Sequence, residues 1–193
     1  SGTGKAGASL AGTTTVNAVA GVTTFTDIRI DGAAEGYTLT ATASGLTGAV
    51  SNSFVVTAAA PTTLIFATQP AGHVIDQGFT TPPVVKVTDV YGNLVSSVNG
   101  VSVAIAITSG TGAAGATLSG TTTVTMTNGI ATFSGLSLDK HGTDYRLTAS
   151  SSTLTSANSA LFIAYATAYS PTMGQMALWG LFASFVALFI MLV

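Results

Sequence analysis

The feature that most constrains this chain of 193 residues is an internal repeat. The stretch SGTGKAGASLAGTTTV, which begins at Ser1, returns as SGTGAAGATLSGTTTV from Ser109, a shift of 108 residues. The register then holds without a gap, so that Phe25 matches Phe133 and Tyr37 matches Tyr145. A period near one hundred residues is too long for a solenoid repeat and fits a β-sandwich domain.

The first copy of the repeat is incomplete. Residues 1–58 correspond only to the second half of the unit, and its first half would precede Ser1. Half a sandwich leaves an open sheet edge and an uncovered apolar face. We therefore expect the natural polypeptide to extend upstream, with at least the front half of this domain. The alternative is that a neighbouring chain supplies the missing strands.

The complete copy, residues 59–166, shows strand signals at the short, even spacing of a sandwich. Val85 and Val87 alternate with Lys86 and Thr88, which is the period of a half-buried strand. Asn128-Gly129 predicts a two-residue hairpin, because both residues tolerate positive φ angles. Seven strands are expected, within 62–68, 83–89, 101–108, 121–127, 129–138, 145–150 and 160–165.

Composition excludes several classes of function. Only 6% of residues are charged and the net charge is −2, so no basic face for nucleic acid is expected. The chain has no cysteine, which excludes disulfides, thiol catalysis and thiolate metal sites. His73 and His141 have no partner at ligand spacing, and the P-loop, nucleophile-elbow and zinc-protease patterns are absent. We expect no enzyme activity, no catalytic residues, no cofactor and no metal.

From Val85 the chain reads V-x-V-x-D-x-x-G-N, followed by a V-x-V strand, G-x-A-T-F from Gly129 and G-x-x-Y-x-L-x-A from Gly142. This order resembles bacterial immunoglobulin-like repeats of the invasin and intimin type. The resemblance covers 59–165 as one full unit and 1–58 as a half. It implies immunoglobulin-like β-sandwiches, which in such proteins are stacked as stalks in adhesins and other surface proteins.

The motif residues also have simple physical roles. Asp89, Gly92 and Asn93 are typical of a turn in which the carboxylate accepts backbone N–H groups. The alternative is a calcium site using Asp89, Asp139 and Asp144, since hard cations prefer oxygen ligands. The aromatic pair of the repeat, Tyr37 and Tyr145, is interpreted as packed rings, with surface recognition as the alternative.

The last 21 residues, 173–193, carry no charge and are long enough to cross a bilayer as one helix. A buried helix of a soluble domain is the alternative, but a sandwich of this size has no room for one. Pro171 precedes the expected helix, with 167–172 as a linker. Three aromatic residues fit the membrane–water interface: Tyr165, Tyr169 and Trp179.

The stretch from Ser170 to Gly180 also resembles the start of bacterial C-terminal sorting tails of the P-T-M-G-E-W-G type. Pro171, Thr172, Met173 and Gly174 match, whereas Gln175 replaces the acidic residue and Met176 stands at the tryptophan position. Such tails continue into a basic cluster after the apolar run, so either further residues follow Val193 or this tail departs from the pattern. The resemblance implies export with retention at the membrane.

Small residues recur on one face of the expected helix, at spacings of three and four. Such rows let helix backbones approach closely and mark helix–helix contacts in membranes. The sequence therefore predicts a contact face made of Ala177, Gly180, Ser184 and Ala187.

Together these patterns predict an all-β protein: tandem immunoglobulin-like β-sandwich domains, the first incomplete, with a single C-terminal transmembrane α-helix. The predicted function is a non-catalytic structural or adhesive stalk of the bacterial cell envelope, with its domains on the extracytoplasmic side. Its expected partners are membrane lipid and other membrane helices. Two alternatives stay open: an accessory subunit of a membrane complex, and a filament subunit with its helices in the core.

Overall fold

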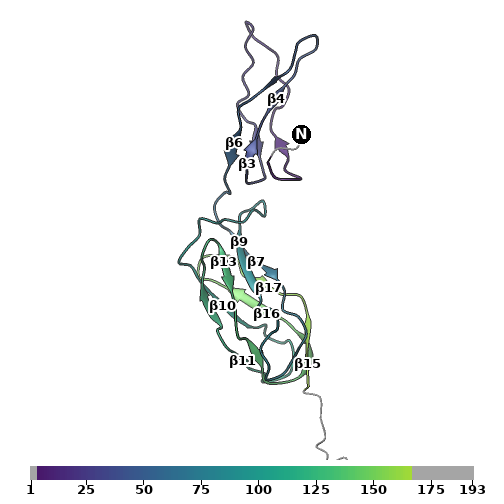
Figure 1. Cartoon of the computed structure of the whole chain (residues 1–193), viewed down its shortest axis with the longest axis vertical. Helices are drawn as coiled ribbons and strands as arrows, with labels where there is room; N and C mark the ends of the chain where they lie inside the picture. The colour runs from purple at the N-terminus through teal and green to yellow at the C-terminus, as the bar shows by residue number, and fades with distance from the viewer. Residues whose placement is uncertain (1–3, 167–193) are drawn as a thin grey trace, which may run out of the picture.

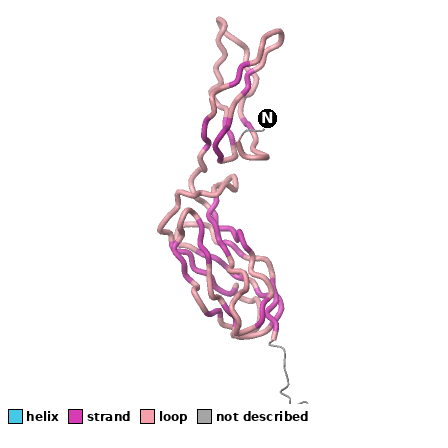
Figure 2. Tube along the Cα trace, viewed as in Figure 1, coloured by secondary structure: helices cyan, strands magenta, loops and turns pink. Residues whose placement is uncertain are grey.

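The computed structural model describes residues 4–166, which form two units placed end to end (Figure 1). The first unit lies at the N-terminal end and contains β1 Leu10–Ala11, β2 Arg29–Ile30, β3 Ala34–Tyr37, β4 Thr40–Ala41, β5 Ala49–Val50 and β6 Phe54–Val56. The second unit contains β7 Thr63–Thr68, β8 His73–Val74, β9 Val84–Thr88, β10 Ser102–Ile107, β11 Leu118–Ser119, β12 Thr123–Thr125, β13 Ile130–Thr132, β14 Ser137–Leu138, β15 Gly142–Tyr145, β16 Leu147–Ser150, β17 Ala157–Asn158 and β18 Phe162–Tyr165. Within this range the secondary structure is strand and loop only (Figure 2).

The second unit is an immunoglobulin-like sandwich. One sheet has the order β13-β9-β7 and the other β12-β10-β16-β17, and all of these neighbours are antiparallel. Towards the C-terminal end of the unit, β8 pairs in parallel with β18, which also pairs with β15. The Tyr145 hydroxyl donates a 2.7 Å hydrogen bond to the Lys140 carbonyl, five residues upstream. This is the tyrosine corner of immunoglobulin-like sandwiches.

The core of the second unit lies between its two sheets. It is built from inward-facing residues of both, including Leu64 and Val103, and Tyr145 of β15 belongs to the same buried cluster. Val85 and Val87 are buried while Lys86 between them is half-buried, as the alternation predicts. Thr88, which the alternation places on the outer face with Lys86, is buried instead, so the prediction is wrong at that position. Phe133, Leu147 and Phe162 are buried as well. Each such side chain contributes roughly 1.5–3 kcal/mol through burial of apolar surface.

The seven segments predicted as strands all contain at least one, but the second unit has twelve strands within the described residues: β8, β11 and β17 lie outside the predicted segments, and β15 begins before the segment 145–150. The segment 129–138 is two strands, β13 and β14, because the chain bends at Ser134 and Gly135, where Gly135 has a φ of +67°. The predicted hairpin is confirmed. Asn128 and Gly129 both have positive φ, and Thr127 and Ile130 exchange two 3.0 Å backbone hydrogen bonds.

The first unit repeats the second half of the second unit, one pair at a time. Leu10 pairs with Ile30 as Leu118 pairs with Leu138, and Tyr37 pairs with Phe54 as Tyr145 pairs with Phe162. By the repeat, the four strands predicted within 121–165 should have four counterparts here; that prediction is wrong, because the described part of this unit contains six shorter strands. Counterparts of β12 and β13 do not form, since their partners β10 and β9 belong to the half that the first unit lacks.

The predicted linker and transmembrane helix, residues 167–193, lie outside the described residues. Among residues 4–166 there is no helix long and apolar enough to cross a membrane. The helix at 173–193 therefore stays a prediction from the sequence.

Candidate functional site: the junction between the two units

Most residues predicted to make membrane contacts lie outside the described part of the chain: Ala177, Gly180, Ser184 and Ala187 of the helix face, with Tyr169 and Trp179. Tyr165, the remaining interfacial aromatic, is the last residue of β18 and is exposed. Its interfacial role stays a prediction.

The three aspartates considered for calcium are not gathered. Asp139 accepts a 2.7 Å hydrogen bond from the Thr117 N–H, and Asp144 accepts one from the Thr143 hydroxyl. Among the described residues, no group of three or more histidine, aspartate or glutamate side chains is placed to hold a metal ion. Asp89 is instead surrounded by hydrogen-bond donors at the junction of the two units.

The Asp89 carboxylate organises the loop that follows β9. One oxygen accepts the backbone N–H groups of Tyr91 at 2.9 Å and Asn93 at 2.8 Å, as the turn interpretation predicts. The other accepts the Ala59 N–H at 2.9 Å and the side-chain amide of Asn93 at 3.0 Å. Gly92, with a φ of +77°, lets the loop fold back. Asp89 thus ties this loop to the segment that joins the units.

Electrostatics favour the charged form of Asp89. Burial raises the pKa of this carboxyl, since its charge is removed from water. The hydrogen bonds from Asn93, Ala59 and Tyr91 outweigh burial and hold the pKa below its ordinary value. The carboxylate therefore stays ionised and acts as an acceptor only.

The Asn93 side chain reaches across the junction into the first unit. Its amide nitrogen donates to the Asp31 carbonyl at 2.7 Å. Its amide oxygen accepts from the Lys5 ammonium at 2.6 Å and from the Ala33 backbone N–H at 3.1 Å. Asn93 itself is buried. A single side chain therefore joins residues that are about sixty positions apart in the sequence.

The surface that Asn93 contacts is held in shape from within the first unit. The Tyr37 hydroxyl donates to the Gly32 carbonyl at 2.8 Å and accepts from the Lys5 backbone N–H at 3.2 Å. The Asp31 carboxylate accepts the Ser9 N–H at 2.7 Å and the Ser9 hydroxyl at 2.6 Å. We call residues 31–33, which Asn93 contacts, the receptor loop.

The packed-ring interpretation of Tyr37 and Tyr145 is confirmed, since both are buried.

Sequence reasoning found the motif but missed this contact. The D-x-x-G-N pattern predicted a turn, and nothing in it pointed to Lys5 or to the receptor loop. In the sequence, Asp89 lies 30 residues after Ala59 of the joining segment, so the position of the motif gave no sign that it would reach the junction.

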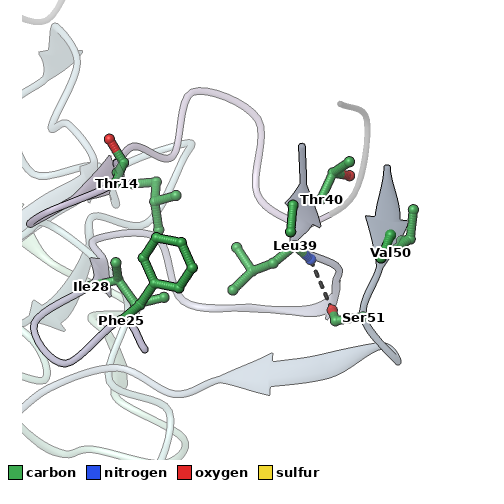
Figure 3. Close-up of a pocket in the computed structure, with 10 residues that line it drawn as sticks. Thr14, Phe25, Ile28, Leu39, Thr40, Val50 and Ser51 are labelled. Carbon is green, nitrogen blue, oxygen red and sulfur yellow. Dashed lines mark hydrogen bonds between the residues drawn. The ribbon is translucent and has the colours of Figure 1, made fainter. Parts of the chain in front are cut away.

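An apolar groove of about 330 Å³ lies in the first unit, away from the junction (Figure 3). Phe25, Ile28 and Leu39 point towards it, and the Leu39 N–H donates to the Ser51 hydroxyl at 2.9 Å. In the second unit, the matching residues Phe133, Leu136 and Leu147 are buried in the core. The groove is thus the inner face of a half-sandwich. That upstream residues or another chain cover it stays a prediction.

A buried histidine is the other unusual polar group. The His73 ring stacks on Phe79, with ring centroids 4.1 Å apart, and neither of its ring nitrogens has a hydrogen-bond partner. Burial lowers the pKa of this imidazole below 6.5. Its partners are aromatic rings of the core, which identifies a packed histidine with no second catalytic group beside it.

Comparison with known proteins finds similarity among solved structures. No protein-family model and no curated protein matches the chain. Among solved structures, the chain is similar to the D00-D0 domain of intimin at 21% sequence identity. The match covers 81% of this chain and 78% of that one, with a TM-score of 0.38. The function is therefore argued from the geometry of the chain itself.

Proposed function

We propose that this chain is a non-catalytic structural or adhesive module of the bacterial cell surface, in which immunoglobulin-like units are stacked end to end as a stalk. The observation that carries the proposal is the joining of two repeat units through the Asp89–Asn93 loop of the second and the receptor loop of the first. Side chains that are committed to holding two units together are what an extended spacer requires. The invasin-type pattern of the sequence supports the same conclusion.

The proposal includes a C-terminal anchor. The uncharged segment 173–193 would cross the membrane and hold the units on the extracytoplasmic side, with Tyr165, Tyr169 and Trp179 near the interface. The small residues around Gly180 and Ser184 would contact another membrane helix, because close packing drives association of helices in lipid.

Fractionation of the producing cells tests this function. A stalk should be found in the envelope fraction, be removed from intact cells by external protease, and extract with detergent as one protein. Stable co-purification with a fixed set of other membrane proteins would favour an accessory subunit. Pelleting without lipid would favour a filament. Recovery in the cytoplasm of intact cells would overturn the proposal.

A further inference from the structure

We propose that Asn93 is the positioning residue that sets the angle between consecutive units, with Asp89 presenting it and the receptor loop receiving it. This inference rests on the proposed function, because a fixed angle has a purpose only in a stack of units. It assigns a specific task to the asparagine of the D-x-x-G-N motif.

The first step of the argument is that the Asn93 amide is fully used. Its nitrogen faces two acceptors, the Asp31 carbonyl and the Asp89 carboxylate. Its oxygen faces two donors, the Lys5 ammonium and the Ala33 N–H. An amide offers two donors and two acceptor positions, so every position is filled. The donors and acceptors around it also fix which way the amide is turned.

No other side chain reproduces this pattern. Aspartate has the same shape but cannot donate, and it would place a second carboxylate beside Asp89. Glutamine has the same groups on a longer stem, and serine has only one donor. Four hydrogen bonds in the plane of one amide constrain its direction, and both units are attached to it. The relative orientation of the units is therefore coupled to this amide.

The second step is that Asn93 contacts backbone groups of the first unit more than side chains. Two of its three contacts in the first unit, Asp31 C=O and Ala33 N–H, are main-chain groups. The same loop recurs in the second unit at Asp139–His141, where Tyr145 bonds the Lys140 carbonyl as Tyr37 bonds that of Gly32. Because these contacts are made to the backbone, the side chains of the receptor loop can differ between units without loss of the contacts. Such a junction suits a stack of repeats that have diverged in sequence.

The third step concerns the joining segment. A flexible linker of six residues, such as 57–62 would be on its own, has a root-mean-square span of about 13 Å. Such freedom would let the units bend against each other. Here the Ala59 N–H is held by Asp89, and Asn93 holds the receptor loop on the other side. The joining segment and the receptor loop are thus both bound to one loop, which prevents bending.

Spin-label distance measurements on the full chain test whether Asn93 fixes the angle between the units. The chain has no cysteine, so cysteines at Ser44 and Ser152, which are exposed and equivalent in the two units, give one label in each. We expect a single narrow distance distribution for the parent chain. Asn93→Ala and Asn93→Asp should widen it to about 10 Å, as free bending of the joining segment allows. The matched control is Asn158→Ala, an exposed asparagine of the second unit bonded to the Thr148 hydroxyl, which should leave the width unchanged.

A variant in the first unit distinguishes unfolding of the second unit from loss of the contact between the units. Lys5 is exposed and belongs to the first unit, so Lys5→Ala cannot unfold the second, yet it should widen the distribution part of the way. A narrow distribution in all three junction variants, or a broad one in the parent chain, overturns the inference. The location of the protein at the cell surface is tested separately by fractionation, so failure of this inference and failure of the proposed function give different results.

Discussion

Phe25 and Phe133 occupy equivalent positions of the repeat, yet Phe25 is 39% exposed and Phe133 is fully buried. The difference does not come from their own surroundings in the sequence. Leu10–Ile30, Tyr37–Phe54 and their counterparts pair in the same register in both units. What differs is the first half of the repeat, since β7, β9 and β10, which belong to both sheets of the second unit, have no counterpart in the described part of the first.

This comparison separates two contributions to the fold. The strand pairs that lie wholly within the second half of the repeat form without the first half. Burial requires the strands of the first half, which complete both sheets, because an uncovered sheet leaves one apolar face in water. The open unit therefore keeps its registers but gains little from its core, and most of the stability should reside in the closed unit.

Truncating the two phenylalanines should show the largest difference. Phe133→Ala removes a ring from a closed core and is expected to lower the free energy of unfolding of the second unit by about 3–5 kcal/mol. Phe25→Ala removes a half-exposed ring that leaves no closed cavity, and should change stability by less than about 1 kcal/mol. Urea unfolding followed at resolved backbone amides by NMR reads each unit separately. Equal losses in the two units would show that the groove is closed in solution.

His73 provides the second test, because it belongs to the half that only the closed unit has. His73→Phe keeps an aromatic ring against Phe79 and removes two unpartnered nitrogens. It should raise the free energy of unfolding by about 1–2 kcal/mol at neutral pH. Calorimetric unfolding of the full chain measures this change.

The pH dependence of the same variant has a defined sign. The pKa of His73 in the folded unit lies below its ordinary value of 6.5, so the unfolded chain binds the proton first as the pH falls. Stability of the parent chain should decrease as the pH drops below about 6.5. His73→Phe should abolish that part of the decrease, whereas His141→Phe, at an exposed position, should not. A decrease of equal size in parent and His73→Phe would contradict this account.

Much of the second unit could be predicted from the sequence, because its signals are local. Alternation placed Val85 and Val87 inside, and Asn128-Gly129 specified its own turn. The repeat transferred the burial of Tyr145 to Tyr37. The break between β13 and β14 was missed, because 129–138 reads as one β-prone run, although Gly135, which has a positive φ, was a local sign of a bend.

The candidate site was less predictable, because it depends on contacts between distant parts of the chain. Asn93 meets Asp31 and Ala33 only when two folded units are stacked, and one sequence carries no sign of that pairing. His73 is similar, since an isolated histidine gives no indication that aromatic rings will enclose it. The predicted helix-contact face around Gly180 is a local pattern, but it lies beyond the described residues.

The smallest expected effect distinguishes two aspartates that the repeat makes equivalent. Asp31 and Asp139 both have a pKa below the ordinary value of 3.8. For Asp31 the largest cause is the Ser9 hydroxyl, 2.6 Å from the carboxylate, and for Asp139 it is the Thr117 backbone N–H at 2.7 Å. Replacing a side chain removes a hydroxyl but leaves a backbone donor in place.

We therefore expect Ser9→Ala to raise the pKa of Asp31 further than Thr117→Val raises that of Asp139, as measured by NMR titration of the carboxyl carbons. Because both pKa values are lowered by folding, their stabilising contribution is present above about pH 3.8 and is lost as the pH falls through the folded values. On acidification the Ser9→Ala variant should lose less stability than the parent chain, because less of the stabilising contribution of Asp31 remains in it. Equal pKa changes in the two variants would mean that the hydroxyl matters equally in both, and that the open unit holds its receptor loop as the closed unit holds Asp139–His141.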